Sequence, residues 1–181
     1  MAPSRSSPGR TEPRPFDPLR ALRTLNREGV RFVIIGGFGG RLLGSPTVTN
    51  DLDICYARDR QNLEALVRAL RRLHADLRGA PPGLPFQWDA DAVAAGDHFT
   101  FLTDAGALDC MATPSGVSGY AELEQKATAL DLDGLMVSVA SIEDLIRMKQ
   151  ASARPKDLIE AEVLGALRDE IEEQRRRSGR R

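Results

Sequence analysis

Two periodicities alternate along the chain, and they separate predicted helices from predicted strands. Apolar residues recur every third or fourth position over 16–28 and 60–77, which predicts two amphipathic helices. The apolar run at 32–35 predicts a buried strand over 31–35, and two aspartates alternate with apolar residues in a second strand at 50–57. A glycine pair and a short helix at 38–43 connect these strands. The first half of the chain therefore predicts a helix followed by a strand–helix–strand unit and another helix.

The second half begins with a predicted hairpin. Strand-like runs at 98–103 and 107–111 flank the turn tripeptide Asp-Ala-Gly. A short helix is expected near 120–127, and the run 130–139 contains an Asp133-Gly134 turn that favours another small hairpin. These patterns predict four further strands.

The chain then becomes helical. Ser141-Ile142-Glu143-Asp144 has the form of a capping box and opens a helix through Gln150. Pro155 suits the first turn of the next helix, which is expected from about 156 to past 172. The element order predicts an α/β (α+β) fold, with a mixed β-sheet flanked by helices and a helical C-terminal end.

Composition shifts suggest the boundaries of this domain. Residues 1–15 are rich in proline without an apolar core, so they predict a disordered arm. The domain is expected over 16–173, with its helical end at 141–173, and 174–181 forms a basic tail. Within the Gly-, Pro- and Ala-rich segment after residue 79, the apolar piece 84–88 is expected to be an edge strand.

Charge and cysteine content restrict the partners. Lys and Arg total 25 against 26 Asp and Glu, so no global field attracts nucleic acid or an anionic membrane. No run reaches the roughly 18 apolar residues that a membrane span needs. Cys55 and Cys110 lack zinc-site spacing and are expected to be small buried residues, which favours a reduced, cytoplasmic protein. Lysine occurs only at 126, 149 and 156, which draws attention to those positions.

Candidate chemistry centres on Asp51 and Asp53. Two residues apart on a strand, they point to one face, roughly 6 to 7 Å apart. Adjacent carboxylates raise each other's pKa unless a cation lies between them, and a divalent metal is the simplest such cation. Gly36 and Gly37 precede them, and glycines at a helix start let a phosphate approach backbone amides. The loop lacks the lysine of a P-loop and the third glycine of a dinucleotide fingerprint.

These residues together resemble a known family. Gly36-Gly37, Gly44 and Thr49-Asn50-Asp51-Leu52-Asp53 resemble the signature of the nucleotidyltransferase superfamily with the DNA polymerase β-like fold, in its minimal and AbiEii-toxin-like branches. Asp109 matches the family's third carboxylate on a later strand. The segment from Ser141 to Asp157 resembles the helical lysine and arginine motif of that branch. The resemblance covers roughly residues 20 to 165.

The resemblance implies Mg²⁺-dependent transfer of a nucleoside monophosphate from an NTP such as ATP to an acceptor hydroxyl on tRNA or protein. Asp51, Asp53 and Asp109 would be catalytic and would bind one or two Mg²⁺ ions, with Asp109 orienting or deprotonating the acceptor. The residues implied in binding the nucleotide are Gly36, Gly37, Thr49, Lys149, Arg154 and Lys156. The toxin-like branch also implies an antitoxin or other protein partner, whereas no membrane partner is expected.

Two positions depart from the family pattern. Thr47 replaces a common arginine, and Gly37 replaces the serine of a Gly-Ser pair. Loss of that arginine removes either a structural anchor or a phosphate contact. The alternative function is a non-catalytic module that binds nucleotide or a partner protein. The three acids are retained.

Each candidate residue also has a structural interpretation. The paired aspartates could be solubilising acids, and Asp109 a polar residue beside a turn. Lys149 could favour a helix C-terminus, where a cation contributes about 0.3 to 1 kcal/mol. Arg154 and Asp157 could form a cap and a surface pair. The two histidines, His74 and His98, are expected at the surface or rim, and the arginine-rich tail 175–181 is either a solvated helix end or an RNA contact.

Overall fold

The computed structural model describes residues 15–79 and 89–178. Helices and strands alternate through most of these two ranges, and the last two elements are helices. In chain order the elements are α1 (Pro18–Arg27), β1 (Phe32–Ile35), α2 (Gly36–Leu42), β2 (Asp51–Tyr56), α3 (Arg60–Arg72), β3 (Asp76–Leu77), α4 (Ala90–Ala95), β4 (His98–Thr103), β5 (Gly106–Met111), α5 (Tyr120–Glu124), β6 (Thr128–Asp131), β7 (Met136–Val139), α6 (Ile142–Ser152) and α7 (Pro155–Ser178).

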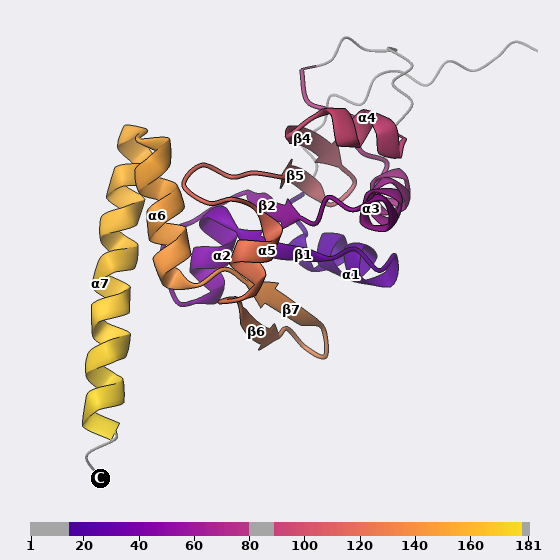
Figure 1. The fold of residues 1–181 in the computed structure, drawn as a ribbon. Helices are drawn as coiled ribbons and strands as arrows, with labels where there is room; N and C mark the ends of the chain where they lie inside the picture. The colour runs from indigo at the N-terminus through magenta and orange to yellow at the C-terminus, as the bar shows by residue number, and fades with distance from the viewer. Residues whose placement is uncertain (1–14, 80–88, 179–181) are drawn as a thin grey trace, which may run out of the picture.

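The strands form one mixed sheet in the order β3-β4-β5-β2-β1-β7-β6 (Figure 1). Strand β2 lies at its centre, antiparallel to β1 and parallel to β5. Strand β1 is also parallel to β7, while β4 and β6 pair with their neighbours as antiparallel hairpins. The predicted mixed sheet with flanking helices is confirmed.

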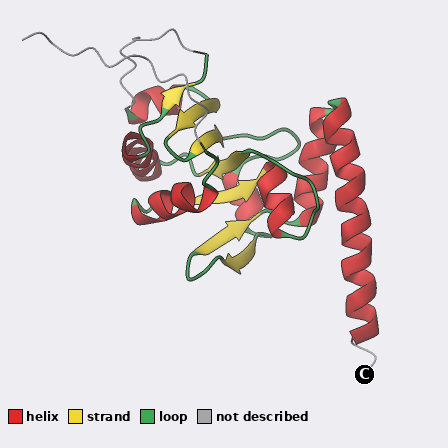
Figure 2. Cartoon of the chain, turned by 180° about the vertical axis from the view of Figure 1, so that it is seen from behind, coloured by secondary structure: helices red, strands yellow, loops and turns green. Residues whose placement is uncertain are grey.

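Helices pack on both faces of the sheet. On one face, leucines of α1 and α3, such as Leu22 and Leu66, share a core with Ile54 of β2. On the other face, Leu123 of α5 and Leu145 of α6 pack with strand residues of β1 and β2. Helices α6 and α7 run side by side at one edge of the domain, and the end of α7 projects past it (Figures 1 and 2). The second face is therefore only partly covered by helices.

The connection between β1 and α2 depends on a glycine. Gly36 has φ +64°, in the left-handed region that favours glycine. A Cβ atom at this position would lie 2.0 Å from Oδ2 of Asp53, which is closer than any real contact. Helix α2 begins at Gly36, two residues earlier than the sequence predicts. The tight turn places its first residues directly beside the central strand.

The predicted helix over 60–77 is wrong in its last turn. Helix α3 ends at Arg72, His74 takes a positive φ of 46°, and residues 76–77 form β3. Leu77 pairs with Phe101 of β4 and packs partly buried against the same core as the helix. The open edge of β4 supplies backbone partners for this segment, so the apolar spacing of a helix continues into a strand.

Other boundaries also differ from the predictions. Helix α4 was not predicted, and the Asp89 side chain caps it by accepting a hydrogen bond from the Ala92 amide at 2.8 Å. Helix α5 ends at Glu124 rather than at 127. Three predicted segments lie wholly or partly outside the described residues. They are the disordered arm, of which 1–14 is not described, the edge strand at 84–88, and the basic tail, of which 179–181 is not described while 174–178 continues α7.

Within the described ranges, no helix combines the length and apolar character needed to cross a bilayer. The two cysteines are both free and buried, as the sequence predicts. They contribute to the core as small apolar side chains.

Candidate functional site

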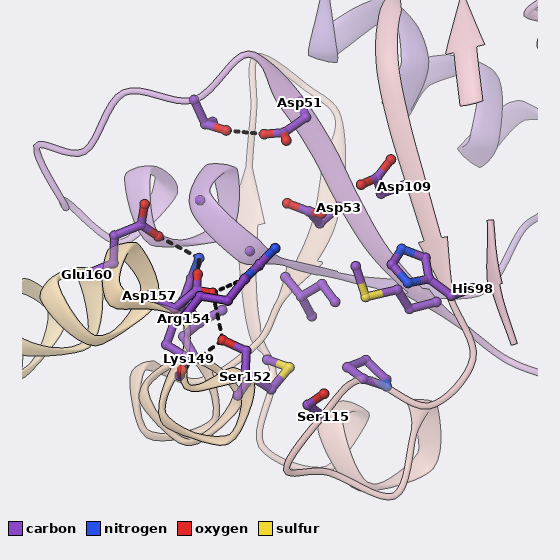
Figure 3. Close-up of a pocket in the computed structure, with 18 of the residues that line it drawn as sticks. Asp51, Asp53, His98, Asp109, Ser115, Lys149, Ser152, Arg154, Asp157 and Glu160 are labelled. Carbon is purple, nitrogen blue, oxygen red and sulfur yellow. Dashed lines mark hydrogen bonds and ion pairs between the residues drawn. The ribbon is translucent and has the colours of Figure 1, made fainter. Parts of the chain in front are cut away.

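Three aspartates meet on one face of the sheet. In the parallel pairing of β2 with β5, Asp53 is the register partner of Asp109. Asp51 is two residues before Asp53, so all three carboxylates point to the same side, while the intervening Leu52 and Leu108 are buried in the core below. Figure 3 shows the three acids next to one another along the two strands. The sheet itself thus brings together the three predicted catalytic residues.

Burial and mutual repulsion strongly perturb these acids. Burial, together with the charges of Asp51 and Asp109, raises the pKa of Asp53 to about 7, although the charges of Lys149 and Arg154 oppose the shift. Burial also raises the pKa of Asp109 above its ordinary value. Carboxylates in this arrangement hold negative charge at a cost in free energy unless a cation joins them.

The carboxylate oxygens differ in their hydrogen bonds. Asp51 accepts a hydrogen bond from the Thr49 hydroxyl. Oδ1 of Asp109 is buried and has no hydrogen-bond partner among the described residues. Within the same residues, no group of three or more His, Cys, Asp or Glu side chains is close enough, as the side chains stand, to hold a metal ion. The acids are therefore gathered on one face without forming a closed coordination shell.

A second polar cluster forms where α6 meets α7. Lys149 of α6 pairs with Asp157 at 2.9 Å and with Glu160 at 2.5 Å. Asp157 also accepts hydrogen bonds from the Ser152 hydroxyl at 2.6 Å and from Nε of Arg154 at 2.5 Å. In Figure 3 this cluster stands opposite the aspartates, on the helical side of the site. One wall of the site is thus acidic and the other carries cations.

The two walls enclose a cavity of about 580 Å³. All nine residues that the sequence implies in catalysis or nucleotide binding line it: Gly36, Gly37, Thr49, Asp51, Asp53, Asp109, Lys149, Arg154 and Lys156. Asp157, which the sequence paired with Arg154, also lines it, as do polar and charged groups that the sequence did not single out: Asp97, Thr113, Ser115, Ser152 and Glu160. Residues far apart in the sequence therefore share one cavity.

The interpretation of Arg154 and Asp157 as a cap and surface pair is wrong for Asp157. This carboxylate is 2% exposed and lies in the core of the polar cluster. Burial opposes its ionisation, but hydrogen bonds from Ser152, Lys149 and Arg154 outweigh it and hold the pKa of Asp157 well below its usual range. Burial alone would lower the pKa of Lys149, but its hydrogen bonds to Glu160 and Asp157 raise it instead. Both groups are therefore charged near neutral pH.

The remaining candidates lie nearer the rim. Arg154 and Lys156 have side chains that are 76% and 80% exposed, and the ammonium of Lys156 is 3.6 Å from Glu160. His98 is exposed at the cavity edge, as predicted for a rim residue. It lies on β4, two residues from the register partner of Asp109, and its charge would favour ionisation of that aspartate.

A signal for the burial of Asp157, and for the missed acid Glu160, was present in the sequence. Asp157 and Glu160 share the buried face of α7 with Ala161 and Leu164, at the spacing of three and four residues that marks one side of a helix. Charged residues on an apolar face are rarely buried without partners. That pattern points to paired, functional or structural acids rather than to solvated ones.

Comparisons with known proteins identify the fold. No protein-family model matches the chain, and no curated protein matches it in sequence. Solved structures do match. The lincosamide antibiotic adenylyltransferase LnuA, in its lincomycin-bound form, aligns at 14% identity with a TM-score of 0.55, over 82% of this chain and 94% of its own. The Thermotoga maritima protein TM1012, assigned as a nucleotidyltransferase, aligns at 17% identity with a TM-score of 0.50, over 84% of this chain and 90% of its own. The predicted nucleotidyltransferase fold is confirmed.

Proposed function

We propose that the protein is a metal-dependent nucleotidyltransferase that moves a nucleoside monophosphate from an NTP to an acceptor hydroxyl. One observation carries the proposal: Asp53 and Asp109 lie opposite each other on parallel strands, and Asp51 shares their face. Three carboxylates beside a cavity, faced by two cations, suit a substrate that combines a metal ion with a polyphosphate.

The residues present fit a Mg²⁺ ion. Magnesium prefers oxygen ligands, and the side chains of Asp51, Asp53 and Asp109 offer six. The unpartnered Oδ1 of Asp109 and the raised pKa of Asp53 both indicate carboxylates that lack a compensating cation. One or two of these carboxylates, together with phosphate oxygens and water, would complete the octahedral set that Mg²⁺ prefers. When bound, Mg²⁺ would supply Lewis-acid stabilisation of the charge that develops on phosphate oxygens.

Residues of the chain itself would admit the nucleotide, neutralise its phosphates and activate the acceptor. Gly36 and Gly37 leave the backbone open beside the aspartates, where side chains would contact Asp53 and Thr49. Lys149 and Arg154, on the opposite wall, would neutralise the triphosphate. Asp109 would orient the acceptor hydroxyl and accept its proton. A new bond forms from that oxygen to the α-phosphorus, the α–β phosphoanhydride bond breaks, and pyrophosphate leaves with the electron pair.

Three acceptor classes fit this chemistry. The lincomycin-bound state of LnuA motivates a small hydroxyl-bearing compound such as a lincosamide. The resemblance to the toxin-like branch motivates tRNA or a protein, with an antitoxin as a further partner. The cavity volume of about 580 Å³ falls within the usual size of small-molecule sites. We therefore rank a small-molecule acceptor first.

Label transfer tests the proposal. The purified protein is incubated with Mg²⁺, each α-³²P-labelled NTP in turn, and either a lincosamide panel, bulk tRNA or a cell extract. We expect label on one acceptor class, released pyrophosphate, and loss of both in Asp51→Ala and Asp53→Ala. Label on tRNA or protein instead of a small molecule would favour the toxin-like role.

Two outcomes would contradict the proposal, one against transfer itself and one against the assigned site. Tight nucleotide binding without transfer to any acceptor would favour the non-catalytic binding module. Transfer that survives in both aspartate variants would place the chemistry elsewhere. A Glu162→Gln variant is a suitable control, because Glu162 is an exposed acid on α7 and does not line the cavity.

A further inference from the structure

Asp157 occupies an unusual position for an acid. Its side chain is 3% exposed, in the first turn of α7 directly after the break between α6 and α7. It accepts three hydrogen bonds from three residues: Lys149 at 2.9 Å, Ser152 at 2.6 Å and Arg154 at 2.5 Å. Two of the donors, Lys149 and Arg154, are cations that line the cavity, as Lys156 also does. Asp157 therefore connects the end of one helix to two of these three positive side chains.

The cations depend on this carboxylate to different degrees. Lys149 is 17% exposed and also contacts Glu160, so two acids hold its ammonium group. Arg154 has a side chain that is 76% exposed, and it forms an ion pair with Asp157. A long, exposed arginine without a fixed partner samples many rotamers. The hydrogen bond that Arg154 donates to Asp157 holds the guanidinium beside the cavity, although most of the side chain is exposed.

The location of the cluster links it to the aspartates. The charges of Lys149 and Arg154 both reach Asp53, because each favours ionisation of that carboxyl. Asp157 thus arranges cations that act on the central acid of the site from the opposite wall (Figure 3). Buried charge networks of this kind fix geometry, since every member is constrained by the others.

We propose that Asp157 is a positioning residue, which holds Lys149 and Arg154 in the orientation that receives the polyphosphate of the nucleotide. The inference rests on the proposed function, because it requires a polyphosphate to bind in this cavity. Asp157 is not a catalytic residue in this proposal, since it acts through the two cations. Ser152 contributes by holding the second carboxylate oxygen.

The direction in which one substitution changes polyphosphate affinity separates this role from simple charge competition. Asp157→Asn removes a negative charge from the wall that faces the triphosphate. If Asp157 only competed with phosphate for the two cations, its neutralisation would tighten polyphosphate binding. If it positions them, binding weakens even though the wall becomes more positive. The two interpretations therefore predict opposite changes in one measured affinity.

Isothermal titration with Mg²⁺–ATP, inorganic tripolyphosphate and AMP measures that change. For Asp157→Asn we expect at least a 10-fold loss of affinity for ATP and tripolyphosphate and less than a 3-fold change for AMP. Glu162→Gln removes one negative charge from the exposed side of the same helix, so its affinities should match wild type within 2-fold. If Asp157 had a merely structural role, Asp157→Asn would weaken the binding of all three ligands alike or of none.

A second comparison keeps the test valid if Asp157→Asn folds poorly. Ser152→Ala leaves both ion pairs in place but removes one hydrogen bond to Asp157, and we expect a 2- to 5-fold loss for tripolyphosphate. In an Arg154→Gln background, Asp157→Asn should cause a smaller further loss than it does in wild type. Equal or tighter polyphosphate binding in Asp157→Asn or Ser152→Ala would overturn the positioning role. Failure of the wild type to bind ATP or tripolyphosphate would instead overturn the proposed function, and this inference with it.

Discussion

Asp53 of β2 and Asp109 of β5 are register partners on adjacent parallel strands. Their side chains emerge on the same face, beside the left-handed Gly36 and across the cavity from Lys149. In a parallel pair the register fixes which residues are neighbours along the strands, so the two aspartates stay adjacent unless the sheet shifts. The repulsion between them is therefore built into the fold, and it makes the protein sensitive to protons and cations.

The stability of the metal-free protein should fall as pH rises. The folded-state pKa of Asp53 is raised from 3.8 to about 7, so its stabilising contribution is complete below the unfolded value and is lost as pH rises through about 7. In EDTA, the unfolding free energy of wild type relative to Asp53→Asn should therefore decrease from about pH 5 to about pH 8. Urea unfolding measures this difference in unfolding free energy. Addition of Mg²⁺ should restore the stability that wild type loses at the higher pH. A difference that stays constant with pH would contradict this prediction.

Gly36→Ala should be more harmful than an ordinary glycine substitution. The added Cβ would lie 2.0 Å from Oδ2 of Asp53, and the φ of +64° is unfavourable for alanine. We expect a loss of about 1 to 3 kcal/mol in unfolding free energy and a loss of nucleotidyl transfer, because Asp53 must move.

Gly165→Ala is the matched control for that variant. Gly165 lies within α7, and a Cβ there would meet nothing within 4 Å. Alanine should raise the unfolding free energy by about 0.5 to 1 kcal/mol through helix propensity. Urea unfolding and label transfer check both variants. If Gly36→Ala and Gly165→Ala change the unfolding free energy in the same direction, the close approach of Gly36 to Asp53 does not determine the effect of Gly36→Ala.

Tyr56→Phe should leave stability unchanged or raise it by up to about 1 kcal/mol. The hydroxyl of Tyr56 is buried and has no hydrogen-bond partner among the described residues, so its removal relieves a desolvation cost. Tyr120→Phe is the counterpart, because the Tyr120 hydroxyl donates to Glu124. That variant should lose about 0.5 kcal/mol. Thermal unfolding of the pair checks the difference, and a marked loss in Tyr56→Phe would reveal a partner for its hydroxyl.

Local sequence was sufficient to predict only part of the acidic wall of the site. The alternation around Asp51 and Asp53 fixes which face they share, and the hairpin pattern places Asp109 on a later strand. That Asp109 lies beside β2 rather than elsewhere came from the family resemblance, since strand order is not encoded in one strand's pattern. The same holds for the fold as a whole.

The cationic wall could not be predicted to the same depth. Asp157 follows Pro155 in a helix start, where acids commonly stabilise the first turn in solvent. Only the packing of α7 on α6 buries it and surrounds it with donors from both sides of the break. In α3, likewise, the pairing of residues 76–77 with β4 ended a helix that its apolar spacing would have continued. Tertiary contacts determined the outcome in both places.

Thr49→Val should impair catalysis without impairing folding. The Thr49 hydroxyl donates to Asp51, and valine keeps the shape of threonine but removes that donor. Asp51 then loses the bond that fixes its orientation, and residues that orient metal ligands typically contribute about 10- to 100-fold. We expect at least a 10-fold fall in transfer rate, a weaker apparent affinity for Mg²⁺, and an unchanged midpoint of thermal unfolding.

Thr47→Val makes the same chemical change two residues away. Thr47 accepts a hydrogen bond from Ser45 at 3.1 Å, and it is not among the described residues that line the cavity. Its variant should therefore transfer label at a rate within about 2-fold of wild type, because no ligand-orienting bond is lost. Titration of Mg²⁺ at fixed NTP compares the two variants directly. Equal losses in both, or none in Thr49→Val, would show that the Thr49 hydroxyl does not orient Asp51 for catalysis.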